Sequence, residues 1–438
     1  MSPTAVGILA VVAFLILMLL RMPIAVSLGL VGVVGFSYLN TPNAAFRLIA
    51  SDFYNTFASY TLSVVAMFVM MGFLAYYAGL GQKLYSVAYR IMGRVPGGLA
   101  MSSVLACVVF GAVCGSNPAT TATIGSIAIP EMRKYKYKDT LSTGSIAASG
   151  AIGAMIPPSV IFIIYGTSTQ ISVSRLFLSG IIPGLLLALF YIITIWILVK
   201  RNPELAPIQL TETGEYKKEK IEAEGLLEVG IVFVVSLGGL FAGWFTPTEA
   251  GAIGAAGVLV ITLIRRQIDW KGISLALRAT TRTTAMIMFL IAGATIFGRL
   301  VAVSRIPFAL ATYVGNLEMP NIVIILITMV IYLVLGTFLD TIPCILLTIP
   351  IFYPVIVEQL GNDPIWFGVF ILMVSSMGVV TPPVGINVYV VKGLVKDIPI
   401  ETIFRGVMPF LLAAFILTLL IIVFPQIATF LPNLLLGP

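Results

Sequence analysis

The sequence predicts an all-α polytopic membrane protein, and its composition and its long apolar runs carry this prediction. Of the 438 residues, 59% are hydrophobic and only 10% are charged, whereas a soluble globular protein has about a quarter of its residues charged. Apolar runs long enough to approach the roughly 20 residues that a bilayer-crossing helix needs recur along the chain. The alternation of apolar and polar residues that marks a membrane β-barrel is absent from the sequence, so the predicted spans are helical.

The apolar runs give the individual spans. The first two lie at Ile8–Leu20 and Ile24–Tyr38, on either side of Arg21. Because no basic segment precedes the first run, we expect both to stay in the mature protein rather than form a cleaved signal. The later runs are Leu62–Ala78, Leu176–Val199, Leu226–Trp244, Thr248–Ile264, Met286–Val303 and Phe404–Phe424.

Basic residues set the orientation of these spans. Most Lys and Arg residues fall in clusters between the apolar runs: Arg21, Lys83–Arg94, Arg133–Lys138, Lys200–Lys220, Arg265–Arg282 and Lys392–Arg405. The positive-inside rule places the clusters in the cytoplasm, and both chain termini are then predicted to be periplasmic. The net charge of +7 thus reflects membrane topology and does not indicate a nucleic-acid partner.

Two intervals predict re-entrant hairpins, which enter the membrane and turn back at mid-depth. Gly98–Glu131 has basic residues beyond both ends and the helix-breaking string Gly115-Ser116-Asn117-Pro118 in its middle. Asn321–Pro354 has the same shape around Gly336 and Asp340, without Lys or Arg at its ends. We expect the first hairpin to enter from the cytoplasm and the second from the periplasm. The alternative for each is a pair of ordinary spans.

Each predicted hairpin is followed by a span that a proline pair interrupts, Pro157-Pro158 in the first case and Pro382-Pro383 in the second. A proline pair removes two backbone donors and pushes the preceding residue out of helical geometry. The order of hairpin and broken helix therefore occurs twice, with opposite orientation. Such inverted repeats with broken helices are typical of secondary transporters, whose binding sites lie at the breaks. Simple kinks are the alternative.

The breaks expose backbone carbonyl groups at helix C-termini, which suit Na⁺, and N–H groups at N-termini, which suit a carboxylate. The side chains around them are mainly neutral oxygen donors, a set that suits an alkali cation: Ser116, Asn117, Thr120, Ser159, Thr337, Thr381 and Asn387. Asp340 is the one acid at a tip, and a carboxylate within the membrane is costly unless paired. A bound cation is its expected partner, with proton binding and a protonated, hydrogen-bonded carboxyl as alternatives.

The remaining polar residues are expected to have structural roles rather than to bind a substrate or an ion. Glu249 follows Pro247-Thr248 and is expected in the first turn of a helix. Arg299 and Arg305 are expected to reach the outer interface, although either could attract an anion or a partner. The amphipathic segment Gln82–Met92 predicts an interfacial arm helix, with Pro307–Val314 in the matching place of the second half.

Several classes of function are disfavoured. The sequence has no histidine, and its three cysteines, Cys107, Cys114 and Cys344, are isolated in apolar segments. A transition-metal site, a disulfide framework and a histidine-based proton pump are therefore not expected. An intramembrane enzyme would need a nucleophile with a base or a metal, and a channel fits two hairpins with two broken helices less well than an alternating-access transporter does.

These motifs together resemble the large membrane subunit of tripartite ATP-independent periplasmic (TRAP) transporters. The resemblance rests on GSNPATTATIGSIAIPEM, GAMIPPS, GVVTPPVGIN, FTPTEAGAIGA and RMPIA, and covers nearly the whole chain. The hairpin architecture is also similar to that of divalent-anion sodium symporters. The resemblance to TRAP transporters implies an elevator mechanism. In this mechanism a transport domain carries Na⁺ and a small organic anion (a C4-dicarboxylate, keto acid, sialic acid or sulfonate) past a fixed scaffold. It also implies two separate partners, a small four-helix membrane subunit and a periplasmic substrate-binding protein.

Carried over residue by residue, the resemblance implies two sodium sites. The first comprises Gly115, Ser116 and Asn117 with backbone carbonyls from Gly153 to Ile156, and the second comprises Gly336, Thr337 and Asp340 with those from Gly378 to Thr381. Many relatives have serine where Asn117 stands, which leaves the side-chain contribution at the first site open. Substrate contacts are expected from Ser116, Asn117, Thr120, Pro157, Ser159, Thr337, Pro383 and Asn387.

The chain is expected to divide into five segments. The scaffold takes residues 1–95 with the first arm, 171–316 with a cytoplasmic loop and the second arm, and the last helix in 398–438, and the transport domain takes 96–170 and 317–397. The competing hypothesis is a stand-alone anion transporter, an exchanger or a symporter coupled to protons or Na⁺, which would not need a binding protein.

Overall fold

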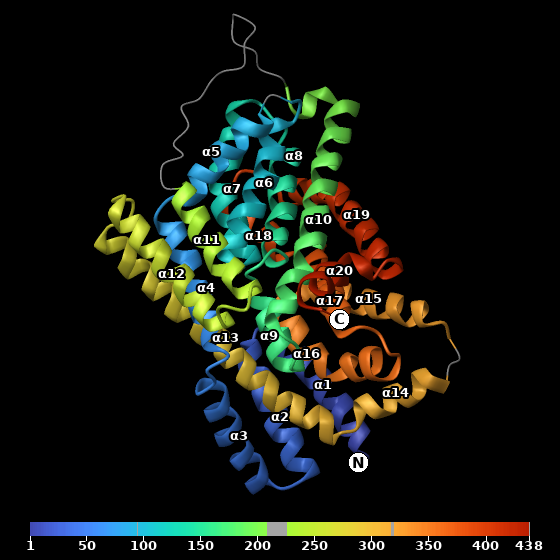
Figure 1. Cartoon of the computed structure of the whole chain (residues 1–438). Coiled ribbons are helices and arrows are strands. Elements are labelled where there is room, and N and C mark those ends of the chain that lie inside the picture. The colour runs from blue at the N-terminus through green and yellow to red at the C-terminus, as the bar shows by residue number, and fades with distance from the viewer. Residues whose placement is uncertain (94, 208–225, 317–318, 438) are drawn as a thin grey trace, which may run out of the picture.

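The computed structural model describes residues 1–93, 95–207, 226–316 and 319–437. Within these ranges the chain consists of helices and short connections, with no strand (Figure 1). Arg94, and Lys217, Lys218 and Lys220 of the predicted basic clusters, lie outside the described residues.

The helices follow the predicted order. The first half contains α1 (Pro3–Leu19), α2 (Ile24–Leu39), α3 (Pro42–Phe57), α4 (Ser63–Tyr77), α5 (Leu80–Met92), α6 (Gly98–Cys114), α7 (Asn117–Lys134), α8 (Asp139–Ser149), α9 (Val160–Thr169) and α10 (Val173–Arg201). The second half contains α11 (Leu226–Phe241), α12 (Pro247–Ile264), α13 (Trp270–Val303), α14 (Ile306–Asn316), α15 (Asn321–Phe338), α16 (Thr341–Tyr353), α17 (Pro364–Gly378), α18 (Ile386–Leu394), α19 (Ile400–Val423) and α20 (Gln426–Leu436). Short helical turns follow α8 (Gly150–Ala154), α10 (Pro203–Leu205) and α16 (Pro354–Gln359).

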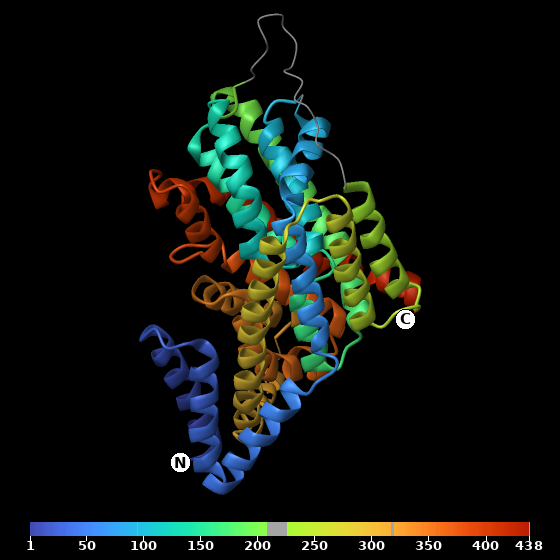
Figure 2. The ribbon, with the colours of Figure 1, turned by 90° about the vertical axis from the view of Figure 1, so that its left-hand side faces the viewer.

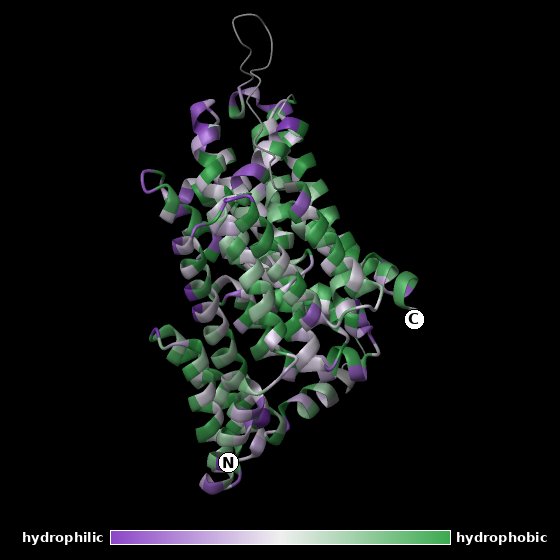
Figure 3. Ribbon diagram, turned by 60° about the vertical axis from the view of Figure 1, so that its left-hand side comes forward, coloured by the Kyte–Doolittle hydropathy of each residue, from purple (hydrophilic) through white to green (hydrophobic). Residues whose placement is uncertain are grey.

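The lengths and apolar surfaces of the helices fit a multi-pass membrane protein. Among the described residues, 6 helices are long and apolar enough to cross a bilayer: α10, α12, α13, α15, α16 with its following turn, and α19. Apolar residues run along most of the helices, and hydrophilic residues are most frequent near helix ends (Figure 3). Helices α4 and α5 meet at a bend of 73°, so α5 leaves the direction of the preceding span, as an interfacial arm would.

The two predicted hairpin segments each form a pair of helices. Helices α6 and α7 join through Gly115 and Ser116, and α15 and α16 join through Leu339 and Asp340. Gly115 has a left-handed φ of 62°, and a Cβ atom there would lie 2.5 Å from the Pro158 carbonyl oxygen, so the turn requires glycine. By length and apolarity α15 and α16 could each cross the membrane, so their re-entrant placement stays a prediction.

The proline pairs interrupt their spans as predicted. The first span runs as α8 and a single tight turn to Ala154, and α9 begins at Val160 after an N-cap at Ser159. The second ends as α17 at Gly378 and resumes as α18 at Ile386. Both proline–proline peptide bonds are cis. The surroundings of the pairs differ, since Pro157 and Pro158 are buried whereas Pro382 and Pro383 are exposed.

The helices pack in two groups. In one group, α4 contacts α12 and α13, and α13 contacts α2 (Figure 2). In the other, α8 packs closely on α19, where a Cβ atom on Gly144 would lie 2.2 Å from the Gly406 backbone, and α10 contacts α6, α17 and α19. Helices from the two halves of the chain contact one another within this second group, since α9 packs on α16 and α18 packs on α7.

Candidate functional site

The tips of the two helix pairs meet. The Asn117 Nδ2 atom, at the start of α7, donates to Thr341 Oγ1 at the start of α16, with a separation of 3.4 Å. The Asn117 Oδ1 atom accepts from the Ala154 backbone N–H at 3.0 Å. Asn117 is 3% exposed, so its amide ties the first tip to both the second tip and the first helix break.

A cavity of about 260 Å³ lies beside this contact. Its walls come from both tips, from the start of α9, and from α4 and α13 of the other helix group: Val69, Phe73, Cys114, Gly115, Ser116, Asn117, Pro118, Ala119, Val160, Ile161, Thr283, Met286, Ile287, Asp340, Thr341 and Ile342. The polar lining therefore comes mainly from the tips, and α4 and α13 supply a largely apolar wall.

Three helix N-termini converge on the cavity. Helix α7 begins at Asn117, α9 at Val160 and α16 at Thr341, and all three residues line it. At each N-terminus the first backbone N–H groups have no partner within the helix, apart from the Thr341 and Phe162 N–H groups, which donate to the caps Asp340 and Ser159. Each terminus carries a partial positive charge of about half a unit. Helix α18, which follows the second proline pair, does not contribute its N-terminus to the lining. This arrangement suits an anionic group.

The C-terminal ends of other helices approach one another at two places, each marked by a pair of glycines. The end of α6 crosses the first break, where a Cβ atom on Gly111 would lie 2.4 Å from Gly153 Cα. The end of α15 crosses the end of α17 in the same way, since a Cβ atom on Gly378 would lie 2.5 Å from Gly336 Cα. In both halves a glycine pair thus brings the carbonyl ends of two helices together, and carbonyl oxygens are ligands that suit an alkali cation.

The structure groups the predicted sodium residues around these two crossings. Gly115, Ser116 and Asn117 lie at the first tip, and Gly153 contacts Gly111 and Thr120. The Ile156 side chain points to α10, where it lies against Gly184.

In the second set, Gly336 contacts Gly378. The Thr337 and Thr381 hydroxyl groups donate to the Val334 and Met377 carbonyls of their own chain segments. Each hydroxyl oxygen keeps lone pairs that could bind a cation.

Asp340 lies at the second tip as the N-cap of α16. Its Oδ1 atom accepts a hydrogen bond from the Thr341 backbone N–H at 2.8 Å, and Asp340 is one of the residues that line the cavity. The ion pairs found among the described residues do not include Asp340. The described ranges also hold no cluster of three or more His, Cys, Asp or Glu side chains that could bind a metal ion.

Of the predicted substrate residues, only Ser116 and Asn117 line the cavity. The others lie outside its lining: Thr120, Pro157, Ser159, Thr337, Pro383 and Asn387. Ser159 caps α9 by accepting from the Phe162 N–H at 3.3 Å. Asn387 is fully buried and donates to the Ala147 carbonyl at 3.2 Å. Residues of the second break and of the start of α18 therefore do not contribute to the lining of this cavity.

Sequence analysis missed several lining residues. Thr341 binds Asn117 and lines the cavity; its place directly after Asp340 at the second tip was a signal that could have identified it. Phe73 and Met286 lie in ordinary apolar spans, and Thr283 lies between a basic cluster and the span that begins at Met286. Nothing in their spacing marks them, because they reach the cavity only through packing between distant helices.

The charged residues outside the cavity mostly support the fold. Glu249 forms a capping box with Thr246 at the start of α12, which confirms its predicted structural role. Arg299 makes an ion pair with Asp52 of α3, with Nη2 3.5 Å from Oδ1, a partner that sequence analysis missed.

One charged cluster links distant parts of the chain. Arg133, at the end of α7, pairs with both Asp139 and Asp397. Hydrogen bonding to Arg133 lowers the pKa of the Asp397 carboxyl below its usual value. The cluster joins the first helix pair to the connection between α18 and α19.

Comparisons with known proteins identify the family. The family described as tripartite ATP-independent periplasmic transporter, DctM component, matches residues 11–427. The C4-dicarboxylate TRAP transporter large permease protein DctM of Pseudomonas aeruginosa is 34% identical over 410 residues, which cover 93% of this chain and 94% of that protein. The sialic acid TRAP transporter large permease protein SiaM of Vibrio cholerae is 33% identical over 417 residues, 95% of this chain and 96% of that protein.

A solved structure shares the fold. The YdaH transporter of Alcanivorax borkumensis superposes with a TM-score of 0.67 at 15% sequence identity, over 91% of this chain and 90% of that one. The sequence matches span almost the whole chain, and the helices are those of a multi-pass membrane protein. The chain belongs to the DctM-component family of tripartite ATP-independent periplasmic transporters, the large permeases of these systems.

Proposed function

We propose that this chain imports a small organic anion together with Na⁺ across the bacterial or archaeal cytoplasmic membrane. It does so as the large permease of a tripartite system, with a small four-helix membrane subunit and a periplasmic substrate-binding protein as partners. The observation that carries the proposal is the convergence of three helix N-termini on one cavity between the two tips.

The cavity favours an anionic substrate for electrostatic reasons. The N-termini of α7, α9 and α16 offer backbone N–H groups, and the Asn117 and Thr341 side chains add polar contacts at the same place. Helix N-termini bind carboxylate and similar anions through this combination. The named substrates of relatives fit, since those proteins are named for C4-dicarboxylate, sialic acid, 2,3-diketo-L-gulonate and isethionate.

Na⁺ is the proposed second cargo, and its sites lie where helix C-termini meet. The crossings at Gly111 with Gly153 and at Gly336 with Gly378 bring carbonyl ends together. Asp340 lies next to the second crossing and also lines the cavity. A cation near Asp340 would offset the repulsion between this carboxylate and an anionic substrate, which gives a physical reason for coupling.

The proposed movement is an elevator motion between two inverted halves. Cross-packing of α9 on α16 and of α18 on α7 supports one moving body that contains both helix pairs and both broken helices. Sequence analysis assigned α10 and α19 to the scaffold. Their close packing on α8, α17 and each other favours placing them in the moving body. The proposed scaffold is then α1–α5 with α11–α14, and α4 and α13 form its wall of the cavity.

The proposed topology follows from the positive-inside rule. The ends of α6 and α7 that lie away from the tip face the cytoplasm, and the two chain termini face the periplasm. In this arrangement the first helix pair enters from the cytoplasm and the second from the periplasm. Cysteine variants at the two termini, labelled from outside intact cells with a membrane-impermeant reagent, would test this orientation.

Reconstitution tests the function. The chain, co-purified with its small membrane subunit, is placed in liposomes, and uptake of a labelled anion is measured with and without the cognate binding protein, under inward Na⁺ or K⁺ gradients. Uptake that needs both Na⁺ and the binding protein supports the proposal. Uptake that persists in K⁺ and follows a pH gradient, without the binding protein, would establish the stand-alone proton symporter instead.

A further inference from the structure

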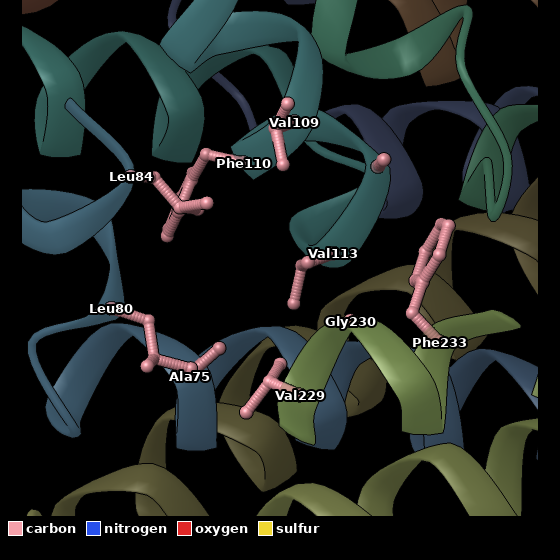
Figure 4. Close-up of a pocket in the computed structure, with 10 residues that line it drawn as sticks. Ala75, Leu80, Leu84, Val109, Phe110, Val113, Val229, Gly230 and Phe233 are labelled. Atoms are coloured by element: carbon pink, nitrogen blue, oxygen red, sulfur yellow. The ribbon is translucent and has the colours of Figure 1, made fainter. Parts of the chain in front are cut away.

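A second cavity, separate from the first, lies between the two proposed bodies. It has a volume of about 110 Å³, and its walls come from the α4–α5 bend, the C-terminal half of α6 and the start of α11. Figure 4 shows the side chains of Leu84, Phe110, Val113 and Phe233 around the open space. Every residue that lines it is apolar or glycine, so it has no group that would bind an ion or a polar solute.

The cavity opens toward the hydrocarbon surroundings of the protein. Val109, on its rim, is 46% exposed. Gly230, on the rim formed by α11, is also exposed. The same helix exposes Ile231 and Val234. The sequence predicts α11 as a membrane span, and on a span an exposed apolar surface faces lipid, so the rim of the cavity is continuous with a predicted lipid-facing surface.

Charged residues near the cavity indicate its depth in the membrane. Glu228, directly before Val229 of the lining, makes an ion pair with Arg265 at the end of α12. Arg265 belongs to a basic cluster that the positive-inside rule places in the cytoplasm. On α11 the lining therefore begins within about one helical turn of the cytoplasmic interface, and on α6 it reaches Val113 near the first tip. The cavity thus lies at the depth of acyl chains in the cytoplasmic leaflet.

We propose that an acyl chain of a cytoplasmic-leaflet phospholipid occupies this cavity. An unfilled apolar space forfeits van der Waals contacts along its lining, and an acyl chain from the surrounding lipid restores them. The cavity is too small for a helix and suits a short stretch of hydrocarbon. The acyl chain would fill the gap between α6 of the moving body and α11 of the scaffold. The proposed elevator motion displaces these two elements relative to each other.

Two glycines on α11 allow a matched test. A Cβ atom on Gly230, in the cavity wall, would have no atom within 4 Å, and the same holds for Gly238 on the same helix outside the cavity. Gly230→Leu adds a bulky side chain in the cavity wall, where there is room for it, and Gly238→Leu adds the same side chain elsewhere on the helix. Both changes raise helix propensity, so neither is expected to impair folding, which the thermal unfolding midpoint checks.

The complex is placed in nanodiscs of phosphatidylethanolamine and phosphatidylglycerol with a small fraction of phospholipid that carries a diazirine within its acyl chain. After illumination, adducts are located by peptide mass spectrometry. We expect enrichment at residues 109–113 and 229–233 over the exposed surface of α11, a several-fold loss in Gly230→Leu, and no loss in Gly238→Leu.

Equal labelling of the cavity and the open surface, or unchanged labelling in Gly230→Leu, would overturn the acyl-chain proposal. So would the absence of adducts at the cavity, including the case in which a side chain of the small subunit fills it. Because the readout is lipid labelling, its failure is distinct from a failure of Na⁺-driven uptake.

Discussion

The Asn117 amide donates to the Thr341 hydroxyl across the interface of the two helix-pair tips, although the residues lie 224 positions apart in the chain. The same amide accepts from the Ala154 N–H at the first helix break. One side chain thus connects the two helix starts, α7 and α16, that border the candidate anion cavity with the first helix break, and it does so from a buried position.

Asn117→Ala is predicted to loosen this junction. The change leaves the Ala154 N–H without its partner, which costs about 1–3 kcal/mol for a buried group. The thermal unfolding midpoint and the uptake rate should both fall. Asn55→Ala, which removes an amide bonded to Ser51 at an exposed site, is the control and should leave both unchanged. Equal effects of the two changes would argue against a junction at Asn117.

Gly378→Ala is predicted to separate the ends of α15 and α17. The new Cβ atom would lie 2.5 Å from Gly336 Cα, and overpacking of this kind costs about 1–3 kcal/mol. We expect a lower unfolding midpoint and weaker apparent Na⁺ affinity in uptake, because the carbonyl groups move apart. Gly393→Ala on α18, where a Cβ atom would meet nothing within 4 Å, should be neutral or slightly stabilising. Normal Na⁺ affinity in Gly378→Ala would exclude a site at this crossing.

The Arg133–Asp397 contact predicts a pH dependence of stability. The pKa of Asp397 is lowered in the folded protein, chiefly by its hydrogen bond to Arg133. The contact therefore stabilises the fold above the usual carboxyl pKa of about 4 and loses its effect as pH falls through the lowered value. The unfolding midpoint of Asp397→Asn should lie below that of the unsubstituted protein at neutral pH.

This difference should shrink in acid. It should also shrink in high salt, since the pair is exposed and screened. A difference between the two proteins that stays constant from neutral to acid pH would show that charge at Asp397 does not stabilise the fold.

Much of the fold could be predicted because its determinants are local. Paired prolines interrupt a helix wherever they stand, so the breaks at Pro157 and Pro382 follow from the sequence alone. The capping box at Glu249 is equally local. The long α13 was predicted only as an apolar span from Met286, because the charged residues before it hid the continuous helix from Trp270.

The site was predicted less completely, since it depends on which helix ends face one another. The two breaks have similar sequences, yet Val160 at the start of α9 lines the cavity and the start of α18 does not. Pro157 is buried and Pro383 exposed, a difference that no local pattern contains. Thr341 and Thr283 enter the site only through contacts between elements far apart in sequence.

The most direct test of the account is the Na⁺ dependence of uptake in Asp340→Asn. Asparagine caps helices as well as aspartate does, so this change removes the charge and keeps the start of α16. Asp363→Asn, at the N-cap of α17 and outside the cavity lining, is the matched control. The account predicts that uptake by Asp340→Asn loses its response to Na⁺ while the control keeps it. An unchanged Na⁺ response in Asp340→Asn would contradict coupling at the second tip.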